Sequence, residues 1–252
     1  MEQLLVYPIG SSESCRYAAK ALEQSGFLLT DHPTPEITHL LLDVPSFDEK
    51  GFLRDGSDLK GLLRMLPRTI TVIGGNLEQD FLQDYRKIDL LRDPCYLAKN
   101  AAITAECALR FVAPYLKGTL ADSPTLILGW GRIGKHLAQQ LSSLGCKVTV
   151  AARKEQDRAM LEAFGYQAVD FSQVSKVLNH CRILFNTVPI LPPSQEILAL
   201  WKGGIAIDLA SHPGMQGEAV IPARGLPGKY APESSGKLIA ETILRFCKEE
   251  AL

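Results

Sequence analysis

Short apolar runs alternate along the chain with longer segments in which apolar residues return every three or four positions. Apolar runs closed by Gly, Pro or Asp are typical of buried strands, and the periodic segments are typical of helices that cover a sheet. The pattern predicts strands at 4–7, 27–29, 39–44, 69–73 and 87–91, and others at 125–128, 147–151, 167–169, 182–186 and 204–208. It predicts helices at 12–24, 58–65, 77–85, 96–117, 132–144, 155–164, 172–178, 194–200 and 232–250.

Strands that alternate with helices predict parallel sheets with helices on both faces. The expected fold class is therefore α/β, with two doubly wound parallel-sheet lobes joined by the long helix at 96–117. We expect the first lobe to contain residues 1–98 together with the last helix in 230–252, and the second lobe to contain residues 99–229.

One glycine-rich turn lies between an expected strand and an expected helix. Gly129-Trp130-Gly131-Arg132-Ile133-Gly134 fits G-x-G-x-x-G directly after the strand at 125–128. In this context the first glycine permits a tight turn, the second admits a diphosphate to the backbone, and the third allows close helix–strand packing. The start of the helix then offers unpaired N–H groups to the phosphates. The second lobe is therefore expected to be a Rossmann-type domain that binds NAD(P) through all six residues.

The end of the next strand bears on the choice of dinucleotide. An NAD site places Asp or Glu there, about twenty residues after the first glycine, to bind the ribose 2′-hydroxyl. This chain has no carboxylate at that point and continues with Arg153 and Lys154, with Arg158 one turn later. Three cations suit a 2′-phosphate, so NADP is favoured and NAD remains the alternative.

Two later loops are expected to line the nicotinamide side, because ligands of open α/β sheets bind at the carboxyl ends of strands. One loop is Asn186-Thr187-Val188-Pro189, and the other begins Asp208-Leu209-Ala210-Ser211. Their small and polar residues suit backbone contacts and hydrogen bonds to the nicotinamide riboside. For Asp208, a turn-capping role is nearly as plausible.

Charge and composition exclude several classes. The 252 residues contain 27 Lys and Arg against 28 Asp and Glu, without the basic excess typical of nucleic-acid-binding proteins. No apolar run approaches a membrane helix in length, and the six cysteines fit no metal pattern. We expect a cytoplasmic protein with reduced thiols, no metal, and no nucleic-acid or membrane partner.

Several spaced motifs resemble the dipicolinate synthase A-subunit family. They are Asn100-Ala101-Ala102-Ile103-Thr104-Ala105-Glu106, Asn186-Thr187-Val188-Pro189, the segment 208–214, and Gly225-Leu226-Pro227-Gly228 followed by Ala231-Pro232 and Gly236. The resemblance extends from about residue 100 to 244. His212 departs from it, since the family has arginine there, and the loop at 10–16 departs from the family's G-G-D-x-R.

The resemblance implies a sporulation-linked oxidation of dihydrodipicolinate to dipicolinate by hydride transfer to a nicotinamide cofactor, together with a flavoprotein-like B subunit. Such an enzyme must bind a small dicarboxylate and set its ring against the nicotinamide. Candidate substrate-binding residues are Ser11, Ser12, Ser46, Thr104, Glu106 and Lys237. Candidate catalytic residues are His212, as the proton acceptor, and Ser211 beside it.

Two other interpretations remain open. The first is another two-domain dehydrogenase of small carboxylic acids, although the arginine and histidine of 2-hydroxyacid dehydrogenases are missing from the expected loops. The second is a non-catalytic dinucleotide-binding subunit with a regulatory or assembly role. By analogy with two-domain dehydrogenases, we also expect a homo-oligomer.

Overall fold

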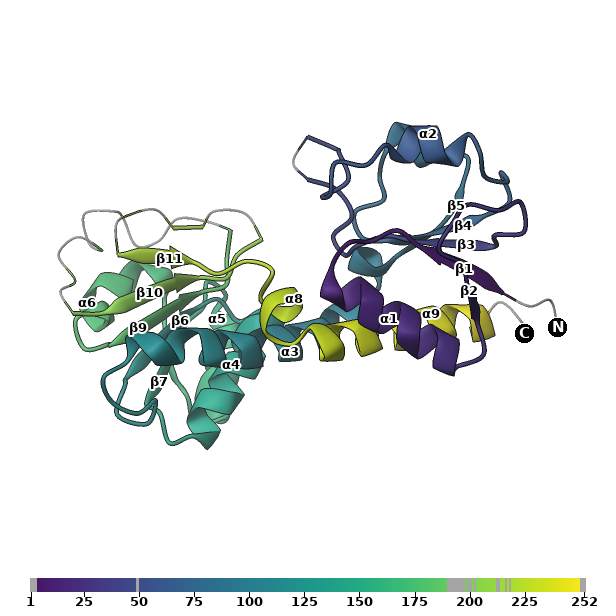
Figure 1. Cartoon of the computed structure of the whole chain (residues 1–252). Helices are drawn as coiled ribbons and strands as arrows, with labels where there is room; N and C mark the ends of the chain where they lie inside the picture. The colour runs from purple at the N-terminus through teal and green to yellow at the C-terminus, as the bar shows by residue number, and fades with distance from the viewer. Residues whose placement is uncertain are drawn as a thin grey trace. The chain divides into compact units, whose positions relative to one another are not determined.

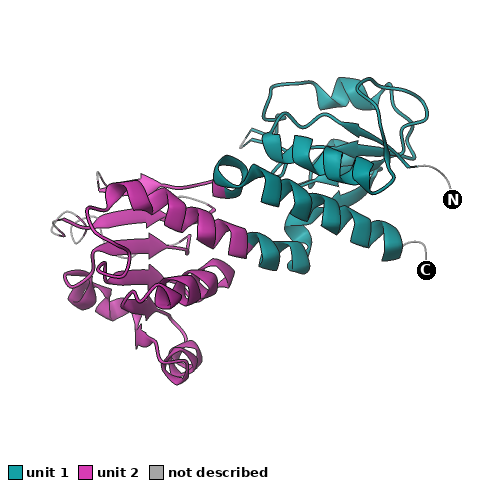
Figure 2. Cartoon of the chain, turned by 60° about the horizontal axis from the view of Figure 1, so that its bottom comes forward, with its two compact units in different colours: residues 1–100, 227–252 teal, residues 101–226 magenta. Residues whose placement is uncertain are grey.

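The structure, a computed structural model, describes residues 4–48, 50–189, 198, 201, 203–211, 214–215, 217 and 219–249. The chain divides into two compact units, one of residues 1–100 and 227–252 and one of residues 101–226 (Figure 2). Helix α3 (Pro94–Val112) leads from the first unit into the second, and α8 (Leu226–Tyr230) leads back.

The first unit contains a five-stranded parallel sheet in the order β2-β1-β3-β4-β5. The side chains of β3 and β4 are buried throughout, as expected of central parallel strands. Helices α1 and α9 lie side by side on one face of the sheet, and α2 covers the other (Figure 1). The strands are β1 (Leu5–Pro8), β2 (Leu28–Leu29), β3 (His39–Leu41), β4 (Thr71–Gly74) and β5 (Arg86–Asp89), and the helices are α1 (Glu13–Gln24), α2 (Leu59–Leu63) and α9 (Pro232–Glu249).

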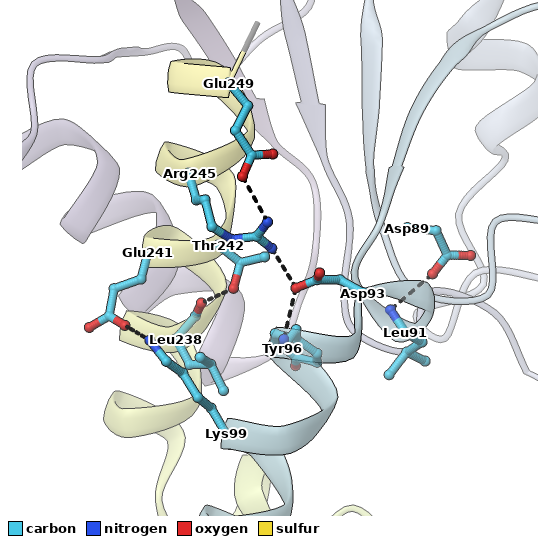
Figure 3. A network of polar contacts seen from close by, with 10 residues as sticks. All are labelled: Asp89, Leu91, Asp93, Tyr96, Lys99, Leu238, Glu241, Thr242, Arg245 and Glu249. Carbon is cyan, nitrogen blue, oxygen red and sulfur yellow. Dashed lines mark hydrogen bonds and ion pairs between the residues drawn. The ribbon is translucent and has the colours of Figure 1, made fainter.

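Helix α9 belongs to the first unit through close packing and ion pairs. A Cβ at Gly236 would collide with Tyr17 and stand 2.6 Å from the Ser14 carbonyl oxygen, so α1 and α9 approach each other closely. Arg245 of α9 donates to the buried Asp93 at 2.6 Å, and Asp93 also accepts from the Tyr96 amide at the start of α3 (Figure 3). Replacing Gly236 or Arg245 would therefore disturb contacts that hold the last helix to this unit.

The second unit contains a six-stranded parallel sheet in the order β11-β10-β9-β6-β7-β8. The sheet extends in both directions from β6, as it does in the Rossmann fold, which confirms the expected fold class. The strands are β6 (Thr125–Leu128), β7 (Val148–Ala151), β8 (Gln167–Val169), β9 (Ile183–Asn186), β10 (Ile205–Asp208) and β11 (Val220–Pro222), and the helices are α4 (Arg132–Ser143), α5 (Glu155–Ala163) and α6 (Val174–Leu178).

The prediction of a helix at 77–85 is wrong. The segment contains only a 3₁₀ turn, η1 (Asp80–Leu82), because the Asp89 carboxylate takes the amides of Asn76 and Leu77 at 3.1 and 2.8 Å. Asn76 adopts a positive φ of 61°, which is incompatible with a helix start at that point. The predicted long helix also ends early, at Val112, and continues as η3 (Ala113–Tyr115) because Pro114 carries no amide N–H.

Two elements were not predicted: the edge strand β11 and the short helix α8. Two further 3₁₀ turns precede helices, η2 (Leu90–Arg92) and η4 (Phe171–Gln173). The helix predicted at 194–200 lies outside the described residues except for Leu198. In the described part of the chain, every helix is too short or too polar to cross a membrane.

Candidate functional site

The glycine turn between β6 and α4 has the geometry that its sequence predicts. Gly129 has a φ of +104°, and a Cβ there would lie 2.6 Å from both Thr187 Oγ1 and Val188 Cγ1. A Cβ at Gly134 would collide with the Gly129 carbonyl oxygen. Gly129 therefore permits the turn, and Gly134 permits the close approach of α4 to it.

Gly131 is different, because a Cβ there would meet no heavy atom within 4 Å. This residue is the N-cap of α4, and it makes no side-chain capping hydrogen bond. The amides of Arg132, Ile133 and Gly134 lie in the first turn of this helix, where no carbonyl within the helix can accept them. Backbone N–H groups at an uncapped helix start are the donors that a diphosphate requires, so this chain fits a dinucleotide at this point.

The turn lies at the switch point of the sheet, where the neighbouring strands β6 and β9 continue in opposite directions of the sheet order. The backbone amide and the hydroxyl of Thr187 both donate to the Leu128 carbonyl oxygen, at 3.0 and 2.8 Å. These bonds hold the loop after β9 against the glycine turn. Ligands of open α/β sheets bind in the crevice at such a switch point.

The end of β7 carries cations and no carboxylate. Ala151 and Ala152 are buried, whereas the side chains of Arg153 and Lys154 are exposed and form no ion pair with another described residue. Their position after the strand next to β6 is that of the residues that contact the adenosine ribose in Rossmann domains.

Arg158 serves a different purpose in this loop. Its Nη1 donates to the carbonyl oxygens of Ala152 and Arg153, both at 2.8 Å, and to Asp170 Oδ2 at 2.9 Å. The Ser172 amide and hydroxyl, followed by the charge of Arg158, lower the pKa of Asp170. Arg158 therefore ties the end of β7 to the end of β8, and its guanidinium is largely committed to that role.

The loops after β9 and β10 are joined by a buried amide–carboxylate pair. Asn186 Nδ2 donates to Asp208 Oδ1 and to the Val188 carbonyl oxygen, both at 2.8 Å. Asp208 Oδ2 accepts the amides of Gly214 and Met215 at 2.9 and 3.3 Å. Both side chains are almost fully buried, and their hydrogen bonds hold the two loops in place.

The other residues predicted for the cofactor or for catalysis differ in exposure. Leu209 and Ala210 are buried, Pro189 and Ser211 are exposed, and His212 lies outside the described residues. Trp130 packs its ring against Tyr166 at 6.0 Å between centroids, with Lys135 Nζ 5.7 Å from the indole. The end of β10 is therefore followed by buried small or apolar residues, and Trp130 of the glycine turn packs against another ring.

In the first unit, Ser11 and Ser12, which were predicted to bind a substrate carboxylate, donate hydrogen bonds to the carboxylate of Asp43. Asp43, which is 8% exposed, follows β3 and accepts the amides of Ser11 and Ser12 at 3.0 and 3.1 Å. The Ser12 hydroxyl, which caps α1, also donates to Asp43. This start of a helix is therefore satisfied by the protein itself.

Ser46 and Lys237 also have partners. The Ser46 hydroxyl is fully buried, donates to the Asp43 carbonyl oxygen and accepts from the Gly75 amide. Lys237 pairs with Glu233 at 2.6 Å on an exposed turn of α9, and this contact raises the pKa of Lys237. On α3, Thr104 is half-buried and Glu106 is exposed, and both belong to the second unit. Of the six predicted substrate residues, Ser11, Ser12 and Ser46 therefore converge on Asp43, Lys237 pairs with Glu233, and the two on α3 belong to the other unit.

Comparison with known proteins agrees with the geometry of the second unit. Residues 108–200 match the family model described as D-isomer specific 2-hydroxyacid dehydrogenase, NAD binding domain. The match supports a nicotinamide dinucleotide as the cofactor of this unit.

The A subunit of dipicolinate synthase from Bacillus subtilis (strain 168) is 27% identical over 159 residues. The chain is similar to this protein. The alignment covers 60% of the chain and 54% of the relative, so the chain spans about half the length of the curated relative that it matches.

Solved structures of the same synthase component share the fold over nearly the whole chain. The Bacillus halodurans protein has a TM-score of 0.81 at 21% identity, with 97% of each chain covered. The Bacillus subtilis protein has a TM-score of 0.81 at 20% identity, covering 99% of this chain and 97% of that one. At these identities the likeness establishes the two-lobed α/β fold.

Sequence reasoning missed two charged residues that meet candidate site residues. Asp43 stands at the carboxyl end of an expected strand, so its position was a usable signal. Arg224 donates from Nε to the Ala210 carbonyl oxygen at 3.2 Å, but it follows β11, a strand without any clear periodic signal.

Proposed function

We propose that the chain is a nicotinamide-dependent dehydrogenase that prefers NADP(H). The observation that carries the proposal is the uncapped start of α4 at the β6/β9 switch point, with open space above Gly131. The amides of 132–134 would bind the diphosphate, and Arg153 and Lys154 would bind the 2′-phosphate. The family match over 108–200 supports a nicotinamide dinucleotide.

The substrate we propose is dihydrodipicolinate, which the similarity to the dipicolinate synthase A subunit supports. The nicotinamide supplies the acceptor for a hydride. The substrate ring loses that hydride and one proton, and gains aromaticity as dipicolinate. Ser211 and His212, in the loop after β10, are the proposed catalytic residues, with His212 taking the proton.

The relative is by name one subunit of a synthase, and we propose that this chain also works with a second subunit, in a sporulating cell, as a homo-oligomer. Co-purification of the tagged chain from such a cell, followed by size-exclusion chromatography with light scattering, tests this part. A chain that stays monomeric and alone at physiological concentration contradicts it.

Titration of the purified chain with NADPH and NADH, followed by nicotinamide fluorescence, tests the cofactor. We expect NADPH to bind at least about tenfold more tightly, a difference of about 1.4 kcal/mol. The double variant Arg153→Ala, Lys154→Ala should lose that preference and leave NADH affinity unchanged. Lys176→Ala, an exposed cation of α6, is the matched control. Equal affinities in the unmodified protein would contradict the NADP assignment, and no binding of either would contradict the function.

A second candidate function is dinucleotide binding without turnover, and Asp43 favours it. This carboxylate fills the position in the first unit at which a substrate carboxylate was expected. Turnover assays that follow the nicotinamide absorbance with dihydrodipicolinate and a panel of small carboxylic acids distinguish the two. Tight NADPH binding without any absorbance change would favour the non-catalytic protein, and a change with another acid would favour a different dehydrogenase.

A further inference from the structure

Arg224 reaches the loop after β10 from the neighbouring edge strand. β11 ends at Pro222, and the Ala223 amide donates to the Asp208 carbonyl oxygen at 2.9 Å, which keeps the chain beside the end of β10. Arg224 follows directly, and its Nε donates to the Ala210 carbonyl oxygen at 3.2 Å. The guanidinium therefore stands at the carboxyl edge of the sheet, on the side of β9 and β10.

The guanidinium retains donors that the protein does not use. Nη2 lies 3.9 Å from Asp208 Oδ2, which is an electrostatic contact and too long for a hydrogen bond. Within the described residues, neither Nη1 nor Nη2 donates a hydrogen bond. The Arg224 side chain is 39% exposed, whereas the Asp208 side chain is 2% exposed. Arg224 thus presents the free end of its fork outward.

Neutralising Asp208 does not account for this arrangement. The carboxylate already accepts hydrogen bonds from Asn186 Nδ2 and from the amides of Ala210, Gly214 and Met215. A carboxylate offers about four acceptor positions, so its hydrogen-bonding capacity is filled without Arg224. The attraction of the buried charge instead keeps the guanidinium against the loop and fixes its direction.

We infer that Arg224 binds a carboxylate of the substrate at the nicotinamide end of the crevice. This inference rests on the proposed function, which puts the nicotinamide beside the loops after β9 and β10. Arg224 is the only Lys or Arg among the described residues of the loops that follow β9, β10 and β11 in the second unit. Its two free nitrogens match the two oxygens of a carboxylate, a pairing that lysine reproduces only as a point charge.

The inference is tested by calorimetric titration of the NADP⁺-loaded full chain with dipicolinate and with its uncharged diamide. Arg224→Gln should weaken dipicolinate binding by about thirtyfold or more, and Arg224→Lys by about fivefold, because the charge-assisted pair is lost or reduced. Affinity for the diamide and for NADPH should change less than about twofold. Arg182→Gln, at the amino end of β9 in the same sheet, is the matched control and should behave as the unmodified protein.

A purely structural role for Arg224 gives a different result. In that case, Arg224→Gln would lower the affinity for dipicolinate, diamide and NADPH together with the melting temperature, and the dipicolinate-to-diamide ratio would stay constant. An unchanged ratio overturns the inference, and so does an unmodified protein that binds NADPH but not dipicolinate. Failure to bind NADPH overturns the proposed function instead, so the two failures are distinguishable.

Discussion

Both units have a switch point in their parallel sheet, but an internal carboxylate accepts the amides at the start of the helix there in the first unit, whereas the helix in the second unit has no side-chain cap. In each sheet the chain leaves a first strand in one direction and returns on its other side, which creates a switch point at β1/β3 and at β6/β9. At β1/β3, Asp43 after β3 accepts the amides before α1. At β6/β9, the corresponding loop offers the uncharged Thr187, and the start of α4 has no side-chain cap.

The comparison shows that a switch point is not in itself a ligand site. The helix start carries a partial positive charge in both units, and an anion there is favoured by about 0.3–2 kcal/mol. In the first unit that stabilisation goes into folding, because the anion is part of the chain. In the second unit it remains available for a ligand. Two residues make the difference: the acid Asp43 after the neighbouring strand, and the N-cap, which is Ser12 in one unit and Gly131 in the other.

The largest expected effect is on NADPH affinity, and it comes from placing a carboxylate at the start of α4, which has no side-chain cap (the open helix start). Gly131→Asp puts a carboxylate above α4, in a space that holds no heavy atom within 4 Å and at a negative φ of −81°. Asp caps a helix a few tenths of a kcal/mol better than Gly and its charge suits the helix start, so the free energy of unfolding should rise by about 0.3–1 kcal/mol. NADPH affinity should fall by about 100-fold, or about 2.7 kcal/mol, because the new charge repels the diphosphate. Fluorescence titration and urea unfolding measure the two quantities.

Gly118→Asp is the matched control, since Gly118 also has open space around it but lies in the turn after η3. It should leave NADPH affinity unchanged. Full affinity in Gly131→Asp would mean that the diphosphate does not bind at α4, and the contrast between the two units would lose its functional meaning.

The second prediction concerns the start of α1, where the Asp43 carboxylate accepts the backbone amides (the closed helix start). Asp43→Ala should lower the free energy of unfolding of the first unit by about 2 kcal/mol, because the amides of Ser11 and Ser12 lose a charged acceptor. Added formate should restore part of that loss in the variant and have little effect on the unmodified protein. Urea unfolding with and without formate, at constant ionic strength, measures both.

Asp55→Ala is the control for this effect, because Asp55 is exposed and its hydrogen bonds go to the neighbouring Ser57. It should cost much less stability and show no formate response. If Asp43→Ala is as stable as the unmodified protein, then the internal carboxylate does not stabilise the first unit in the way its hydrogen bonds imply.

The parts of the fold that local sequence determines were predictable. Buried runs such as β6 and β9 are largely apolar, and glycine at 129 and 134 is required by close contacts at the turn. The segment at 77–85 has helical periodicity, but the Asp89 carboxylate, twelve residues or more along the chain, accepts hydrogen bonds from the amides of Asn76 and Leu77. Long-range hydrogen bonds of this kind leave no periodic signal.

In the candidate sites, too, the features set by local sequence were predictable and those set by long-range contacts were not. The glycine motif is recognisable from sequence because its spacing is local. Asp43 and Arg224 act on residues far away in sequence, Ser11 and Ser12 in one case and Ala210 in the other. A strand-end acid or cation shows its effect only when the strand order is known, and β11 had not been predicted.

The smallest expected effect concerns Cys15, in the first turn of the closed helix. A helix start ordinarily lowers the pKa of a thiol. Here burial first, and then the charge of Asp43, raise the pKa of Cys15 to about 12, against a hydrogen bond from the Gly10 backbone that lowers it. The folded protein therefore keeps the proton, whereas in the unfolded chain the thiol has its ordinary pKa of 9.0. The stability from this group is complete below that value and is lost as pH rises from there toward the folded pKa.

Between about pH 8 and pH 10 the unmodified protein should therefore lose about 1 kcal/mol more stability than Cys15→Ala, as measured by urea midpoints. Cys95→Ala, which removes an exposed cysteine, should lose as much as the unmodified protein. Asp43→Ala should reduce the loss, because the carboxylate no longer raises the pKa of the thiol. Equal slopes in Cys15→Ala and the unmodified protein would show that Cys15 ionises normally, and that the internal carboxylate does not control the electrostatics of the closed helix start.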